Sequence, residues 1–155
     1  MSVSPRLREF LDRHGVTYQV LADAPPHATH TGRDAVRVVV IRHGGGLSLA
    51  VLPAHARIDL DRLGAALREE IVPASLNEIA KVFPECDPGA VPPLGILDGL
   101  KTYLDESLTH DRQIVFHAGA RETVIRMSLE EYRRVAAPIV LWFAESPARR
   151  GMASG

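Results

Sequence analysis

The chain has 155 residues, of which 46% are hydrophobic and 24% are charged, and its formal net charge is −1. These proportions are typical of a globular domain and exclude extensive disorder. The charge balance argues against a dedicated duplex-binding module, which usually has a strongly basic surface. No apolar run approaches the roughly 20 residues of a membrane helix, and the first residues lack the apolar core of a signal peptide, so we expect a cytoplasmic protein without membrane contact.

The N-terminal part predicts a helix, a strand and a loop. Ser4 can cap the helix, Pro5 suits its first turn, and apolar residues recur at helical spacing as far as Leu11. Residues 16–21 then predict a strand. Residues 23–34, with two prolines and two histidines, predict a loop.

A β-hairpin and two helices follow. The β-branched run 36–41 is typical of a buried strand, the glycines within 43–46 turn the chain, and 47–52 returns as the second strand. Asp59 can cap one helix, and a capping box opens another at Ser75.

The second half begins with a segment that is neither a helix nor an ordinary strand. Residues 84–99 read PECDPGAVPPLGILDG, with four prolines and three glycines. After it, 101–104, 113–116 and 123–127 predict short strands. The last two are expected to pair as a hairpin across Gly119.

The C-terminal part predicts a helix from Ser128 to about Ala136, one short helical turn within 138–143, and a frayed end. We therefore divide the chain into one domain, 1–144, and a flexible tail, 145–155. Hairpins interleaved with helices favour an α+β fold, in which helices pack on a mixed sheet.

The residues disfavour nucleophilic hydrolysis and metal chemistry. There is no G-x-S-x-G elbow, and the serines fall at caps, turns or termini, so a Ser-His-Asp triad is not predicted. Cys86, the only cysteine, has an acidic neighbour on each side, which raises the pKa of a thiol and makes it inert. His27 and His30, followed by Asp34, are spaced like metal ligands, but we interpret them as polar loop residues.

Three regions contain glycines that could form a ligand site. The turn 43–46 joins two strands, so it is a hairpin turn and not a phosphate loop. In 84–99 and in the turn 117–120, glycine lets a ligand approach the backbone, and converging N–H groups can stabilise an oxyanion. These two regions are either pocket-lining loops or rigid scaffold turns.

Several motifs follow one another in a specific order between about Ser4 and Phe143. They are GGG and LAVLP within 44–53, RIDL at 57–60, ECDPGAVPPLG at 85–95, YLDES at 103–107 and IVFHAG at 114–119. In this order, and with the element G-x-x-P-P-x-G, the chain resembles the YbaK / prolyl-tRNA synthetase-associated domain family, whose members include free-standing aminoacyl-tRNA deacylases.

This resemblance implies a single α+β domain with a curved, barrel-like mixed sheet and flanking helices. It implies trans-editing, in which the ester of a small mischarged amino acid such as alanine, cysteine, serine or proline is hydrolysed on tRNA. The implied partners are the acceptor end of mischarged tRNA and an aminoacyl-tRNA synthetase. No metal, cofactor or protein nucleophile is expected, because a substrate hydroxyl and a bound water do the chemistry.

The resemblance also assigns roles to individual residues. Arg37 would hold a phosphate near the terminal adenosine, while backbone groups surround the ester carbonyl and the prolines limit side-chain size. The catalytic set is Arg37, Gly95, His117 and Gly119, and the substrate-binding set is Pro92, Pro93, Leu94 and Ala118. This assignment requires Arg37, Gly95 and Gly119 to converge on one cleft.

Three departures from the family pattern leave alternatives open. Arg37 replaces the usual lysine, His117 replaces an asparagine or small polar residue, and only 32–36 separates the preceding loop from the strand, where relatives have a longer helical segment. Alternatively, Arg37 is a strand residue that extends to solvent, and His117 is a strand-end histidine with its hydrogen bonds made within the protein.

The alternative function is a catalytically silent relative that binds the acceptor end, a synthetase or a nucleotide-like ligand. A hydrolase of another small acyl ester is a third.

Overall fold

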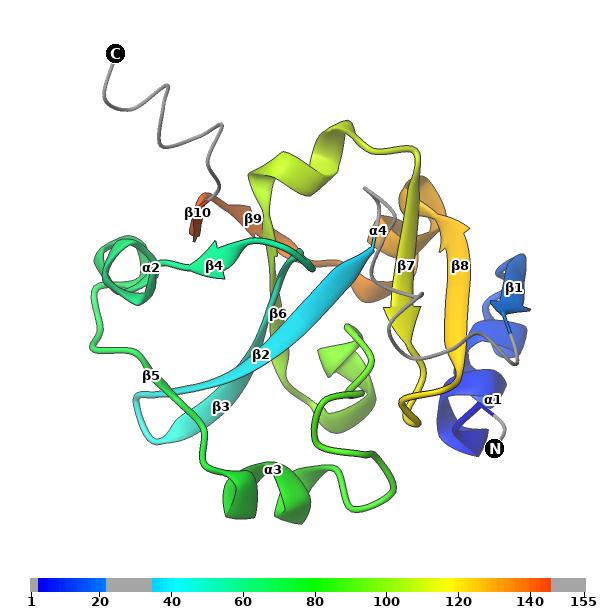
Figure 1. Ribbon diagram of the computed structural model, residues 1–155, viewed down its shortest axis with the longest axis horizontal. Coiled ribbons are helices and arrows are strands. Elements are labelled where there is room, and N and C mark those ends of the chain that lie inside the picture. The colour runs from blue at the N-terminus through cyan, green and yellow to red at the C-terminus, as the bar shows by residue number, and fades with distance from the viewer. Residues whose placement is uncertain (1–2, 22–34, 146–155) are drawn as a thin grey trace.

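The computed structural model describes residues 3–21 and 35–145 (Figure 1). The predicted loop 23–34, including His27, His30 and Asp34, lies outside the described residues, as does 146–155. The helices are α1 (Pro5–Arg13), α2 (Leu60–Leu67), α3 (Leu76–Val82) and α4 (Leu129–Ala136), with two 3-10 helices, η2 (Gly95–Asp98) and η3 (Glu106–His110). The strands are β1 (Tyr18–Leu21), β2 (Val36–His43), β3 (Gly46–Pro53), β4 (Arg57–Ile58), β5 (Val72–Pro73), β6 (Lys101–Asp105), β7 (Gln113–His117), β8 (Val124–Ser128), β9 (Ile139–Leu141) and β10 (Ala144–Glu145).

The strands form three sheets in a mixed α+β domain, as predicted. A five-stranded sheet has the order β5-β2-β3-β6-β9, a three-stranded sheet the order β1-β8-β7, and β10 pairs with β4. Both predicted hairpins, β2–β3 and β7–β8, are confirmed. The described sheets do not close into a barrel, and one parallel bridge, between Ala35 and Val115, joins the start of β2 to β7.

The prediction of a helical turn within 138–143 is wrong. Residues 139–141 form β9, which pairs in parallel with β6. Two β-branched residues, Ile139 and Val140, suit the open edge of β6 better than an isolated turn of helix. Glu145, placed in the tail by the sequence, pairs with Arg57 in the small sheet.

The predicted helix starts depend on real side-chain caps. Asp59 accepts a hydrogen bond from the amide of Arg62, and Ser75 forms both bonds of a capping box. Ser128 caps α4 in the same way as Asp59 caps α2. Ser4 makes no side-chain cap; its backbone N–H donates instead to the carbonyl of Ala118 at 3.3 Å.

The two faces of the five-stranded sheet bury different cores. On one face, Val36 and Val51 pack with Leu94 and with the three-stranded sheet, α1 and α4. On the other face, Ile41 and Leu52 pack with α2 and the C-terminal strands. Figure 1 shows α1 and α2 on opposite sides of the molecule. Val40 of β2 belongs to a third cluster, with Leu49, Phe83 and Val91. Side chains of β2 alternate between the two faces of the sheet, as expected for a strand.

Candidate functional site

The two predicted pocket regions lie side by side. The N–H of Gly119 donates to the carbonyl of Ala90 at 2.9 Å, and the N–H of Asp87 donates to the carbonyl of Gly119 at 2.8 Å. Gly119 has φ +101°, and a Cβ there would lie 3.3 Å from the Cβ of Ser4. Glycine is therefore needed at this position for the turn and for its close packing.

The middle of the 84–99 segment is held in place by a hydrogen bond from Tyr132 of α4. This fully buried phenol on α4 donates to the carbonyl of Pro93 at 2.7 Å. Burial raises the pKa of Tyr132, so its hydroxyl stays a donor at all physiological pH values. The segment is thus a rigid part of the fold and not an open loop.

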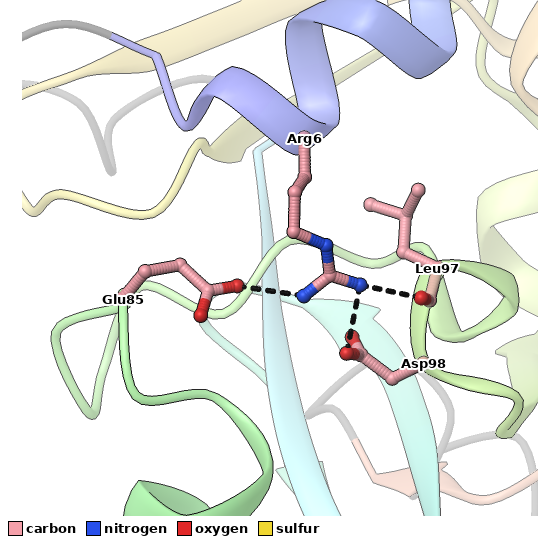
Figure 2. Close-up of polar contacts among 4 residues, drawn as sticks. All are labelled: Arg6, Glu85, Leu97 and Asp98. Atoms are coloured by element: carbon pink, nitrogen blue, oxygen red, sulfur yellow. Dashed lines mark hydrogen bonds and ion pairs between the residues drawn. The ribbon is translucent and has the colours of Figure 1, made fainter.

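A narrow pocket lies between this segment and the start of α1. Pro92 and Leu94 line it together with Cys86, Phe83, Ser4 and Leu7. Its cavity volume is about 10 Å³, which is room for about one water molecule. Arg6 closes it by bonding to Glu85, to Asp98 and to the carbonyl of Leu97 (Figure 2).

The thiol of Cys86 lies in this enclosed pocket. Burial, with a smaller contribution from Glu85, raises its pKa to about 11. The thiol therefore stays protonated at neutral pH, as its acidic neighbours predicted.

The predicted backbone donors already have acceptors within the protein. The N–H of Gly95 donates to Oγ1 of Thr102 at 2.9 Å, and that of Ala118 donates to the carbonyl of Thr123 at 3.0 Å. The N–H of Gly119 is taken by Ala90. Their role around an ester carbonyl therefore stays a prediction, and it would require these bonds to be exchanged.

No hydrogen bond among the described residues joins Arg37 to this segment, and the convergence of Arg37, Gly95 and Gly119 on one cleft stays a prediction. In the β2–β3 register Arg37 lies opposite Leu52, which belongs to the core on the α2 face. Its Nε and Nη2 both donate to the carbonyl of Ala56, at 3.1 and 3.0 Å. Leu94 packs on the other face of the sheet. The sequence predicts the alternation along β2 but not which face the segment covers.

The guanidinium of Arg37 is half-buried and has no carboxylate partner in the part of the chain that the structure describes. Burial lowers its pKa, because desolvation penalises the charged form. A cation in this position is expected to attract an anion, because a buried charge is costly until it is paired.

His117 and Arg37 occupy equivalent positions on neighbouring strands, each two residues beyond one parallel bridge. The parallel bridge places Ala35 beside Val115, so Arg37 and His117 each follow two residues later in the same direction. Val36 and Phe116, the residues between, both point into the core that packs against the three-stranded sheet. The Nδ1 atom of His117 is shielded from solvent. We call the junction at 35–37 and 115–117 the β2–β7 seam; a joint role of Arg37 and His117 there stays a prediction.

Sequence reasoning missed one polar cluster. His43 contacts Glu69 through Nδ1 at 3.1 Å and Ser48 Oγ through Nε2 at 2.9 Å, which is the order of a hydrolase triad. Ser48 is only 3% exposed, and its strand lies between β2 and β6. Nothing in local sequence could reveal the cluster, because Glu69, which follows α2, is 26 residues from His43 in the chain.

Among residues 3–21 and 35–145, no three His, Cys, Asp or Glu side chains are grouped so as to hold a metal ion. The H-x-x-H pair lies outside that range, so the interpretation of His27 and His30 stays a prediction. No helix in the described part of the chain is both long and apolar enough to cross a membrane.

Comparison with known proteins agrees with this fold. A family model described as the aminoacyl-tRNA editing domain matches residues 15–135. No curated protein sequence matches the chain. Among solved structures, hypothetical protein APE2540 has a TM-score of 0.81 at 17% identity, covering 90% of this chain and 99% of its own.

Two further solved structures share the fold. A proposed trans-editing enzyme for prolyl-tRNA synthetase has a TM-score of 0.77 at 21% identity, covering 94% of this chain and 100% of its own. A scaffold protein used for computational epitope grafting has a TM-score of 0.78 at 21% identity, covering 93% and 100%. At these identities the structural likeness shows the fold alone. The family match spans more than three quarters of the sequence, and this chain belongs to the aminoacyl-tRNA editing domain family.

Proposed function

We propose that this protein is a trans-editing deacylase, which hydrolyses the ester between a small mischarged amino acid and the 3′ end of tRNA. Family membership supports aminoacyl-tRNA editing in general. The observation that carries the finer proposal is the half-buried guanidinium of Arg37, which has no anionic partner among the described residues and shares the β2–β7 seam with His117.

Arg37 is suited to bind a phosphate of the acceptor end. A guanidinium donates two parallel hydrogen bonds to a phosphate, and such charge-assisted bonds are roughly twice as strong as neutral ones. The carbonyl of Ala56 fixes the position of the group through Nε and Nη2. The bound phosphate would then place the ester of the terminal ribose near the seam.

The reaction is a simple hydrolysis. A water oxygen bonds to the carbonyl carbon of the ester, the bond from that carbon to the ribose oxygen breaks, and the ribose oxygen takes up a proton. Neutral His117 can accept the proton of the attacking water or donate one hydrogen bond to the substrate. No protein nucleophile enters this sequence of steps.

The remaining predicted residues belong to the turn that follows His117 and to the segment bonded to that turn. Ala118 and Gly119 continue directly from His117, and Gly119 is hydrogen bonded to the 84–99 segment. The 84–99 segment is kept rigid by four of its residues, Pro92, Pro93, Leu94 and Gly95. We propose that they limit the space available to the aminoacyl side chain by fixing where the turn lies.

The test uses tRNAs charged with alanine, cysteine, serine or proline, and compares the wild-type protein with Arg37→Ala and Arg42→Ala. Arg42 lies on the same strand, is exposed, and pairs with Glu78 at 3.6 Å, so it is a matched control. We expect release of at least one amino acid by the wild type. Arg37→Ala should lower kcat/KM by about 10- to 100-fold, which corresponds to about 1.5–3 kcal/mol for a lost charge-assisted bond. Arg42→Ala should change it less than twofold.

One observation favours the catalytically silent alternative. The N–H groups of Gly95, Ala118 and Gly119 are all donated to protein acceptors, which leaves them unable to stabilise an oxyanion without rearrangement. A relative of this kind would bind an acceptor end without cleaving the ester. If a mischarged tRNA is bound but none of the panel is turned over, this alternative replaces the deacylase.

A further inference from the structure

Arg6 joins the two ends of the 84–99 segment (Figure 2). It lies in the first turn of α1, and its guanidinium bonds to Glu85 and Asp98, each at 2.9 Å. It also donates to the carbonyl of Leu97. Because these partners lie at opposite ends of the segment, one side chain closes it into a loop.

The contacts of Arg6 use the shape of the guanidinium. Nη1 reaches Glu85, and Nη2 serves both Asp98 and the carbonyl of Leu97. A planar fork with several donors can hold three acceptors at once, whereas a lysine ammonium is a compact charge on a flexible stem. Asp98 is only 14% exposed, so at least one of the two ion pairs is shielded from solvent.

The segment that Arg6 closes carries the turn after His117. Asp87, two residues from Glu85, donates its N–H to the carbonyl of Gly119 and accepts from the amide of Arg121 at 3.0 Å through its side chain. The carbonyl of Ala90 accepts from Gly119. A continuous set of bonds therefore runs from Arg6 through 85–90 to 119–121.

We propose that Arg6 is a positioning residue for the editing site. By holding the ends of 84–99 together, it keeps the turn 118–121 in place and so fixes where His117 lies relative to Arg37. This inference rests on the proposed function for its catalytic consequence. Arg6 acts through Glu85, Leu97 and Asp98, and we assign it no contact with the substrate.

The test compares Arg6→Ala and Arg6→Lys with Arg13→Ala. Arg13 is on the same helix and pairs only with Glu9 among the described residues, so it is the control for losing a helix arginine. Hydrogen exchange is measured for peptides covering 84–99 and 117–121, and kcat and KM are measured on the tRNA that the wild type deacylates best.

We expect Arg6→Ala to speed amide exchange at least tenfold in both peptides. It should lower kcat about tenfold while KM changes less than twofold, because phosphate binding by Arg37 is unaffected. Arg6→Lys should give intermediate values of both exchange and kcat, and Arg13→Ala should match the wild type.

Unchanged exchange in 117–121 on Arg6→Ala overturns the inference, whatever happens to activity. Faster exchange with an unaltered kcat also overturns it, because Arg6 would then only stabilise the segment. If the wild type releases no amino acid from any tRNA, the proposed function fails, and exchange still decides whether Arg6 controls the turn.

Discussion

Burying the guanidinium of Arg37 lowers the stability of the folded protein unless the charge is paired. Desolvation of a cation is offset only when acceptors or an anion replace the lost water. The carbonyl of Ala56 supplies part of this compensation through two bonds. On the proposed function, a substrate phosphate would supply the rest.

The Ser48 cluster tests whether hydrolysis uses a protein nucleophile. Ser48→Ala removes the bond to His43 but leaves the β2–β7 seam untouched. We expect deacylation within twofold of the wild type, and a free energy of unfolding lower by about 1 kcal/mol because one buried hydrogen bond is lost. Parallel measurement of deacylation rates and urea unfolding checks both.

Loss of deacylation by tenfold or more in a folded Ser48→Ala protein would contradict this expectation. It would make Ser48 the nucleophile, His43 the base and Glu69 the orienting acid. The water-based mechanism at Arg37 and His117 would then be wrong.

Individual site residues were predictable only in part. The glycine at 119 was identifiable from its motif, and its φ of +101° with the close approach of Ser4 gives the physical reason for it. The face on which Arg37 lies was not identifiable, because strand alternation fixes only relative directions. Arg6 gave no signal at all, since its partners are about 80 to 90 residues away in the chain.

At the scale of elements, α4 holds the proline-rich segment through a single phenol. Tyr132→Phe keeps the ring in the core but leaves the carbonyl of Pro93 without its donor. A buried polar group without a partner costs about 1–3 kcal/mol. For a chain of this size, that loss of free energy corresponds to an unfolding midpoint lower by roughly 3–10 °C.

Scanning calorimetry of Tyr132→Phe, with Tyr18→Phe as the control, measures this effect. Tyr18 bonds to Asp12 at 3.1 Å near the surface, so its loss should shift the midpoint by much less. Equal shifts for the two variants would show that the bond to Pro93 does not stabilise the segment.

Elements with strong local signals were predicted correctly. The capped starts of α2, α3 and α4 and the hairpins β2–β3 and β7–β8 follow from caps, glycines and β-branched runs. Strand β9 was not predicted, because its pairing with β6 is parallel and involves residues more than 30 apart. Two-residue strands such as β4 and β5 have too few residues to show any pattern.

At the scale of the whole molecule, one buried carboxylate ties the C-terminal strands to the central sheet. Asp105 accepts from the amides of Phe143 and Ala144, each at 2.8 Å, and from the amide of Ser107 at 3.1 Å. Asp105 also caps η3 by accepting this bond from Ser107. Its contact with 143–144 depends on the tertiary fold and could not be predicted locally.

The α+β class followed from the alternation of helices and hairpins, and the order of the motifs predicted the family. The division of the buried residues into three clusters did not follow from either. That division bears on the site, because Arg37 pairs with Leu52, of the core on the α2 face, whereas Leu94 belongs to the core on the other face. The central claim is therefore that Arg37 binds the phosphate of the terminal adenosine from the α2 face.

The most direct test varies the arginine and the phosphate together. Hydrolysis of an aminoacyl adenosine is compared with that of the same compound carrying a 5′-phosphate, using the amino acid that the wild type removes fastest. The wild type should prefer the phosphorylated compound by tenfold or more in kcat/KM, and Arg37→Ala should show nearly equal values for the two. An undiminished preference for the phosphate in Arg37→Ala would contradict the account.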